Sequence, residues 1–198
     1  MSMRPAAIEA RFPSERRLLE HEPIIALGGA ALYGSNLGEI QEIEFGKGKI
    51  VVDDANSPFT NAEFPMVVLA TLGFTAKDTA YLTNKAESTV ATQLKAAMQG
   101  IREDSSAQIR TKTGLARYCF MNQIYYRDEP GARLYLSPSE ARVVKHLSYG
   151  ENSKSIGTSL GLSSSTVDAH VKNVSKRSGL HGREQVVLAA FLSGEISI

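Results

Sequence analysis

The chain has 198 residues, with 22 lysines and arginines, 21 aspartates and glutamates, and a formal net charge of +1. This near-neutral balance excludes a polycation that binds nucleic acid by bulk charge, so any contact with DNA must come from a local patch. The length allows one domain or two to three small ones, and it excludes a large two-lobed enzyme.

The cysteine content and the apolar runs bear on the compartment. The single cysteine, Cys119, forms no intrachain disulfide and no multi-thiolate zinc site, which fits a reducing compartment, and we expect it to be a small buried residue. The apolar run at residues 24–37 is broken by glycines and is shorter than the roughly 20 residues that span a bilayer. We therefore expect a cytoplasmic protein without membrane contact.

The first third of the chain is predicted to hold a β-hairpin. Residues 39–45 and 49–53 are β-rich runs separated by the turn Gly46-Lys47-Gly48, and Asn56-Ser57-Pro58 marks a boundary. Residues 1–58 hold 6 basic and 9 acidic side chains, so this part is the least suited to contact phosphate. We take residues 1–57 as an N-terminal segment with a hairpin.

From residue 58 onward the apolar spacing becomes helical. Residues 66–70 and 89–101 fit helices, and Asp128-Glu129-Pro130-Gly131 supplies a second linker. Beyond this linker, four short helices are expected at residues 139–149, 153–160, 164–178 and 183–192. The sequence thus predicts helical domains at residues 58–127 and 134–198.

An internal repeat relates the two helical domains. Residues 59–95 align with residues 136–172 at a constant offset of 77, with eight identities where ordinary composition gives roughly two. The identities are Glu63/Glu140, Val67/Val144, Gly73/Gly150, Lys77/Lys154, Ser88/Ser165, Thr89/Thr166, Val90/Val167 and Lys95/Lys172. We also match residues 112–115 with 177–180, which requires about 12 extra residues in the first copy. We predict a tandem repeat.

The last copy has the pattern of a helix-turn-helix. Val167, Val171 and Val174 fall at i, i+4 and i+7 and are expected to face inward. The opposite stripe is predicted to be Ser165, Asp168 or Ala169, Lys172 and Lys176. Two short helices joined by a glycine-containing turn place the second in the major groove of DNA. Periodicity alone equally allows a four-helix module whose exposed stripe is only solvated.

Residues 136–180 resemble a known family, with the string LSPSEARVVKHLSYGENSKSIGTSLGLSSSTVDAHVKNVSKRSGL. The Leu-Ser-Pro-x-Glu opening, the Ser-Lys-x-Ile stretch, the Ser-x-x-Thr-Val-x-x-His run and the later Gly-Leu are similar to the C-terminal DNA-binding domain of LuxR/FixJ-type bacterial transcription regulators. Residues 85–98, KAESTVATQLKAAM, followed by KTGL at 112–115, resemble a second and degenerate member.

The resemblance implies a set of DNA contacts in each copy. In the last copy the implied residues at base edges are Asp168, Ala169 and Lys172, and those near phosphates are Lys154, Ser164, Thr166 and Lys176. Small side chains at Ser164, Ser165 and Ala169 are expected to let the backbone approach DNA. The matching residues of the first copy are Ala91, Thr92 and Lys95, with Lys77 and Thr89 nearby.

Several positions depart from the family pattern. Asp168 stands where a basic residue is common, and it repels phosphate and accepts only from a base amine such as that of cytosine. Gly157 replaces a usual alanine within a helix, at a cost of about 1 kcal/mol. The first copy carries Thr79, Thr83 and Lys85 where the last has Ile156, Leu160 and Leu162. We expect its second helix to pack differently or to have lost DNA reading.

Other chemistry finds no support in the sequence. Residues 50–54 resemble the opening of a phospho-receiver domain, but the first helical repeat begins too soon after them, and the glycines at residues 28–38 match no nucleotide-binding loop. The four histidines, at positions 21, 146, 170 and 181, do not fall at metal-ligand spacing with carboxylates. We predict no enzyme, no cofactor and no metal.

The predicted fold is mainly α, with two tandem four-helix LuxR-type helix-turn-helix modules and a small N-terminal β-hairpin segment. The resemblance implies a sequence-specific bacterial transcription regulator, with activation the expected outcome, that reads double-stranded DNA through the third helices. The family's usual sensor domains do not fit before Phe59, so we expect control by abundance or a protein partner. In the alternative, the first module binds RNA polymerase or another regulator and only the last binds DNA. A homodimer is compatible with both.

Overall fold

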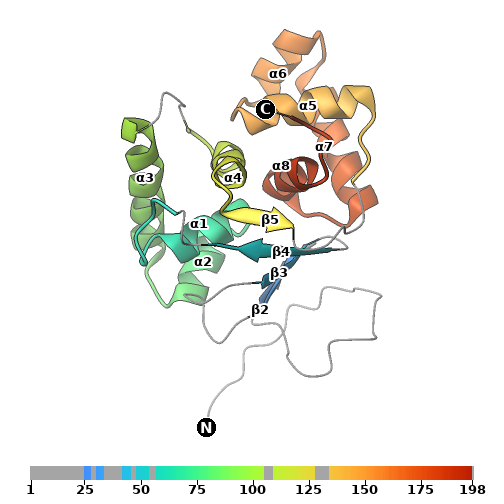
Figure 1. Cartoon of the computed structure of the whole chain (residues 1–198). Helices are drawn as coiled ribbons and strands as arrows, with labels where there is room; N and C mark the ends of the chain where they lie inside the picture. Colours follow the sequence, from blue (N-terminus) through green and yellow to red (C-terminus); the bar gives the residue numbers. More distant parts are fainter. Residues whose placement is uncertain are drawn as a thin grey trace.

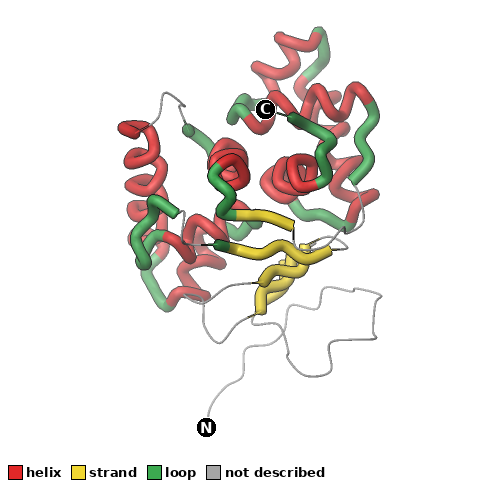
Figure 2. Tube along the Cα trace, in the orientation of Figure 1, coloured by secondary structure: helices red, strands yellow, loops and turns green. Residues whose placement is uncertain are grey.

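The computed structural model describes residues 25–27, 30–33, 42–45, 48–53, 57–104, 109–127 and 134–197. Within these ranges the helices fall into two groups of four that follow one another in the chain (Figure 2). The first group is α1 (Phe64–Thr71), α2 (Ala76–Thr83), α3 (Glu87–Asp104) and α4 (Lys112–Met121). The second is α5 (Pro138–Ser148), α6 (Ser153–Leu160), α7 (Ser164–Ser178) and α8 (Gly182–Leu192), so the four predicted C-terminal helices are confirmed.

The strands form one antiparallel sheet that is larger than the predicted hairpin. Its order is β1 (Ile25–Leu27), β2 (Ala30–Tyr33), β3 (Glu42–Phe45), β4 (Gly48–Val52) and β5 (Tyr125–Arg127). The β3–β4 hairpin is confirmed, with Ile43 opposite Ile50. The expectation of a hairpin alone is wrong, because β1 and β2 lie in the apolar run at residues 24–37, for which no strand is predicted. The turn at Gly46 and Lys47 lies outside the described residues.

The fifth strand ties the first helical group to this sheet. Residues 125–127, which we had placed in the helical domain, follow α4 and pair with β4. The buried hydroxyl of Tyr125 lies 2.6 Å from the hydroxyl of Thr71 in α1. Three residues are too few to show a strand period, so β5 has no local signal in the sequence.

One contiguous apolar core joins the sheet to both helical groups. The inward side chains of β3 and β4 are buried together with side chains from the other seven described helices, and Leu82 of α2 packs against this core. Cys119 of α4 is fully buried, as expected, and burial raises the pKa of its thiol. Figure 1 shows α4 and α8 beside each other at the centre, above β5, with α3 at one side and α5, α6 and α7 at the other.

The two helical groups share local geometry at positions 77 residues apart. The carboxylate of Glu63 accepts from the backbone N–H of Thr60 at 3.0 Å, and that of Glu140 accepts from the backbone N–H of Ser137 at 2.9 Å. The second helices begin at the side-chain caps Thr75 and Asn152. They end at the left-handed residues Asn84 (φ 52°) and Gly161 (φ 69°).

The match that we drew between residues 112–115 and 177–180 is wrong. Residues 112–115 lie in the first turns of α4, whereas residues 177–180 span the end of α7 and its left-handed cap Gly179. The N-cap positions of the fourth helices are Thr111 and His181, which lie 70 residues apart. The first copy therefore has fewer extra residues before its fourth helix than we had inferred. Both strings contain Gly-Leu, but Gly114 lies inside α4 whereas Gly179 is the C-cap of α7.

Gly157 is required by a close backbone approach at the turn after α6. The backbone N–H of Leu162 donates to the Gly157 carbonyl at 2.8 Å. A Cβ on Gly157 would lie 2.5 Å from the carbonyl oxygen of Leu162, which is closer than two such atoms pack. We had read this glycine as a simple cost in helix propensity, and the structure shows what it permits.

An ion pair between a buried glutamate and a half-exposed arginine joins the first and third helices of the second group. The side chain of Glu140, 8% exposed, accepts from Arg177 at 3.1 and 3.0 Å through both guanidinium NH₂ groups. Arg177 also donates to the Tyr135 carbonyl at 2.8 Å. The guanidinium, assisted by the Ser137 hydrogen bonds, lowers the pKa of Glu140 from 4.5 to about 2. The first group keeps Glu63 but has Gly100 at the position of Arg177.

We predict that Gly157→Ala lowers the free energy of unfolding by about 1–3 kcal/mol, because the clash with the Leu162 carbonyl exceeds the gain in helix propensity. Gly100→Ala is the matched control, since a Cβ there meets nothing within 4 Å inside α3, and it should stabilise by about 0.5–1 kcal/mol. Urea denaturation followed by circular dichroism measures both. Equal stability of Gly157→Ala and the parent chain would show that the turn relaxes freely.

Glu140 should control acid stability. A carboxylate with a lowered folded-state pKa stabilises above its unfolded pKa, so about 3 kcal/mol should be lost as pH falls from about 5 to about 2. Glu140→Gln should be less stable than the parent at pH 7 and should flatten this acid limb. Glu63 has Gly100 instead of an arginine at the matched position, so Glu63→Gln should leave the fall in stability at acid pH as steep as in the parent. Parallel acid limbs for Glu140→Gln and the parent would contradict the assignment.

Candidate nucleic-acid interface

The α6–α7 unit is a helix-turn-helix fixed by local polar contacts. The Asn152 side chain caps α6 by accepting from the backbone N–H of Ser155 at 2.9 Å. Gly161 then takes the left-handed conformation that ends α6 with little steric cost. The Ser163 hydroxyl begins α7 by accepting from the backbone N–H of Thr166 at 3.0 Å. Because each end has its own cap, the short turn holds α7 at a defined angle to α6.

The predicted division of α7 into two faces is confirmed. Val167, Val171 and Val174 are buried against the core. The predicted positions in this group are all exposed, namely Lys154, Ser164, Ser165, Thr166, Asp168, Ala169, Lys172 and Lys176. Lys172 and Lys176 lie one turn apart along the exposed stripe, with the small side chains of Ser165 and Ala169 on the same stripe. A backbone with such short side chains can approach a nucleic acid closely.

Asp168 is held in a three-way polar contact. Its Oδ1 accepts from the Ser153 hydroxyl at 2.6 Å and from the Arg183 guanidinium at 2.6 Å, and Arg183 also donates to Ser153 at 2.6 Å. These contacts join the start of α6, the exposed side of α7 and the first turn of α8. The acidic residue on the stripe is therefore paired with a cation. Sequence reasoning missed Arg183 and Ser153, because they lie on two other helices and their contact with Asp168 depends on the angles between the helices.

The first helical group presents the matching positions in a less basic setting. Lys77, Thr89, Ala91, Thr92 and Lys95 are all exposed on α2 and α3. At the start of α3, however, Ala86 and Glu87 occupy the positions of Ser163 and Ser164. Alanine has no cap acceptor, and the glutamate carboxylate faces the same end of the helix where a phosphate would bind.

The polar residues Thr79, Thr83 and Lys85, in α2 and just after it, are accommodated within the first group. Thr79 is buried, and the Thr83 hydroxyl donates to its carbonyl at 2.7 Å. The ammonium of Lys85, at the position of Leu162, donates to Gln93 at 3.2 Å. Met66, Ala80 and Val90 form a small core cluster of their own. The helix therefore forms in place, with polar contacts where the second group has apolar ones.

Over the described ranges, no group of three or more histidine, cysteine or acidic side chains is arranged to hold a metal ion. His146 contacts the Glu151 carboxylate at 2.7 Å on one edge of the second group. The part of the chain that the structure describes also contains no helix long and apolar enough to cross a membrane.

Comparison with known proteins finds a family match for the second helical group. Residues 134–190 match the family model described as GerE, bacterial regulatory proteins, luxR family. Neither curated proteins nor solved structures gave a match to the chain. The matched residues run from the segment before α5 almost to the end of α8 and include the whole α6–α7 unit. This part of the chain, less than a third of it, is therefore similar to the DNA-binding domain of LuxR-family regulators.

Proposed function

We propose that this protein is a sequence-specific DNA-binding transcription regulator whose principal reading element is α7. The observation that carries the proposal is the exposed stripe of α7 on a LuxR-type domain, with Lys172 and Lys176 beside short side chains. Residues 153–178 hold four basic side chains and one acidic one, Asp168, which is paired with Arg183. This local excess of positive charge suits phosphate, although the whole chain is nearly neutral.

We extend the proposal to the first helical group as a degenerate LuxR-type module, within domains at residues 58–127 and 134–198. The matched caps, the left-handed residues at the ends of α2 and α6, and the glutamates before α1 and in α5 support it. In this proposal α3 is a second, weaker reading helix. Its weakness follows from charge, because residues 76–101 hold three basic and two acidic side chains.

A second candidate function for the first module is favoured by the same departures. Glu87 at the start of α3 opposes phosphate, and Tyr81 of α2 is 72% exposed. A surface of this kind suits a protein partner such as RNA polymerase or another regulator, with activation as the outcome. In this version α7 alone reads DNA and α3 contributes only to transcriptional output.

We predict that Lys172→Ala weakens binding by about 1–3 kcal/mol to a duplex selected by the full chain from a random pool, and relaxes preference at one base pair. Lys95→Ala, at the matched position of α3, should weaken binding less and act at a second position about one DNA turn away. Fluorescence anisotropy on the selected duplex and its single-base variants measures both effects.

Thermal unfolding serves as the control that both lysine variants are folded. Unchanged affinity for Lys95→Ala, together with reduced transcription in a reconstituted assay, would assign the first module to a protein partner. Unchanged affinity for both folded variants would contradict the placement of the third helices on DNA.

A further prediction concerns the charge of the stripe. Arg183→Gln leaves the Asp168 carboxylate without its cation on the DNA-facing stripe, so affinity should fall about tenfold through repulsion of phosphate. Adding Asp168→Asn in the same chain should restore most of this loss, and the double-mutant cycle gives the coupling. If Asp168→Asn restored nothing, Arg183 would contact DNA directly instead of neutralising Asp168.

A further inference from the structure

The fourth helices pack against each other and each also packs on the first helix of the opposite group. α4 contacts α8 and α5, and α8 contacts α4 and α1. Exchanging the two groups turns the α4–α5 contact into the α8–α1 contact and leaves the α4–α8 contact as it is. This is the contact pattern of a two-fold axis, here within one chain.

Two glycines occupy matched places in this arrangement. Gly73 and Gly150 lie 77 residues apart, and both have positive φ, at 88° and 81°. A Cβ on Gly73 would lie 3.3 Å from the carbonyl oxygen of His181, and one on Gly150 would lie 2.7 Å from the hydroxyl oxygen of Thr111. Thr111 and His181 are the N-cap positions of α4 and α8. Each glycine thus admits the start of the opposite group's fourth helix.

The residues before these glycines are also contacted from across the interface. The buried side chain of Gln185 in α8 donates to the carbonyl of Leu72 at 2.9 Å. The guanidinium of Arg117 in α4 lies 4.2 Å from the centre of the Tyr149 ring. Leu72 and Tyr149 are the C-cap residues of α1 and α5. One contact is a hydrogen bond and the other a cation–π contact, but each joins a fourth helix to the C-cap residue of the opposite group's first helix.

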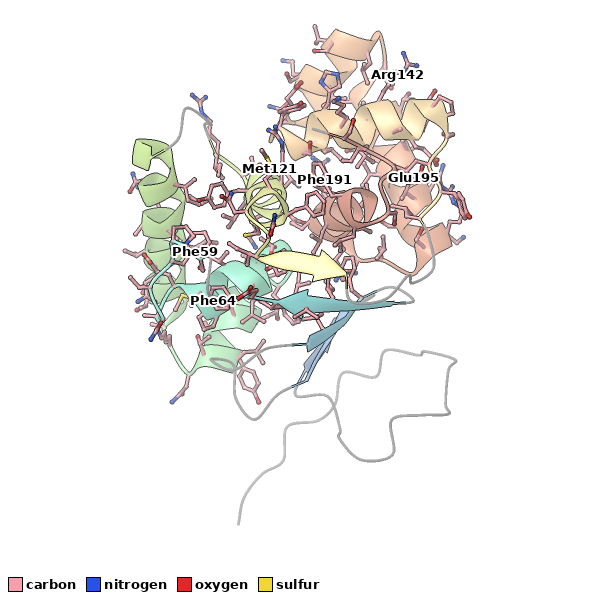
Figure 3. All side chains as sticks on the ribbon, viewed as in Figure 1. Phe59, Phe64, Met121, Arg142, Phe191 and Glu195 are labelled. Carbon is pink, nitrogen blue, oxygen red and sulfur yellow. The ribbon has the colours of Figure 1, made fainter. Side chains whose placement is uncertain are left out.

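An aromatic pair lies at the centre of the contact. The rings of Phe120 and Phe191 stack with centroids 5.0 Å apart and planes inclined by 18°. Both residues come from the last part of a fourth helix. Figure 3 labels Phe191 in the space between α4 and α8, the two helices that pack together. We call this contact between α4 and α8, with the two C-cap–glycine pairs, the central interface.

We propose that the central interface makes a single chain the complete two-headed DNA-binding unit, a pseudo-dimer closed within one polypeptide. The inference rests on the proposed function in treating both helical groups as helix-turn-helix modules. A two-fold contact normally uses the same surface of two separate copies. Here the fourth helix of each group is covered by that of the other, so a second chain has no free equivalent surface to use.

The arrangement also sets how the two third helices are presented. α3 and α7 lie on opposite sides of the α4–α8 pair (Figure 1). They are therefore carried by one packed body, so that α3 keeps a fixed position relative to α7 whether or not DNA is bound. Because the pairing is intramolecular, it needs no minimum protein concentration, unlike the assembly of two chains.

The interface is tested without DNA by cutting the chain between the groups. A protease site inserted between Glu129 and Pro130 lets the full-length protein be purified intact and then cleaved. We expect the intact protein to have the mass of one chain, and the two cleaved pieces to remain together in size-exclusion chromatography with light scattering. Phe120→Glu, which places a carboxylate against Phe191, should separate the cleaved pieces. Tyr81→Glu, a matched change at a 72% exposed aromatic residue of α2, should not.

Because Phe120→Glu can also unfold the first group, Arg117→Ala provides a second variant that removes the contact with Tyr149 and introduces no buried charge. It should raise the concentration at which the cleaved pieces separate by about tenfold. Separation of the unmodified cleaved pieces at micromolar concentration would overturn the proposal. An intact protein with the mass of two chains, as in a dimer that exchanges its modules, would also overturn it.

Native mass spectrometry on the duplex selected from a random pool tests the consequence for DNA. We expect one chain per duplex, and the amount of complex should rise with the protein concentration and not with its square. Two chains bound cooperatively to one site would overturn the single-chain unit. If no duplex is selected at all, the proposed function fails, whereas the cleavage experiment still decides whether the central interface exists.

Discussion

The packing of α4 on α8 is the contact on which the rest of the arrangement depends. It joins the two helical groups into one apolar core, and it lies over β5, through which the sheet meets the first group. It also sets the positions of α3 and α7 at the two outer sides. Burial of apolar surface supplies the driving force, while the left-handed glycines at 73 and 150 permit the close approach of the opposite helix starts.

The two groups differ in the contacts that fix the third helix. In the second group, Arg177 ties α7 to Glu140 of α5, and Arg183 ties it to the start of α8. In the first group Gly100 replaces Arg177, and α3 packs mainly on α1 and α2. Two ion pairs hold the third helix in the second group, whereas side-chain packing and the Lys85–Gln93 hydrogen bond hold it in the first, with Ala86 in place of a capping serine. Reading of DNA should follow the same order.

The helices could be predicted from sequence because their signals are local. In the second group, caps such as Ser137 with Glu140, left-handed glycines and valines at helical spacing indicated the bounds within about a residue, whereas in the first group only α1 and α3 were predicted, one to three residues short at their ends. The sheet was only half predictable, since β5 is three residues long and is held by pairing with β4, far away in the chain. The exposed stripe of α7 was correct, but the pairing of Asp168 with Arg183 and Ser153 needs the angle between three helices. The central interface was equally beyond periodicity, because each half looks like an ordinary core helix.

The central claim, that α7 lies in the major groove of a specific site, is tested most directly by affinity cleavage. Cys119 is fully buried and burial raises the pKa of its thiol, so an iron chelate on Lys172→Cys should label the introduced thiol selectively. Bound to the selected duplex, this protein should cut the DNA at one cluster of positions centred on the major groove of a single half-site. Scattered cleavage along the duplex, or none, from a labelled protein that still binds would contradict the account.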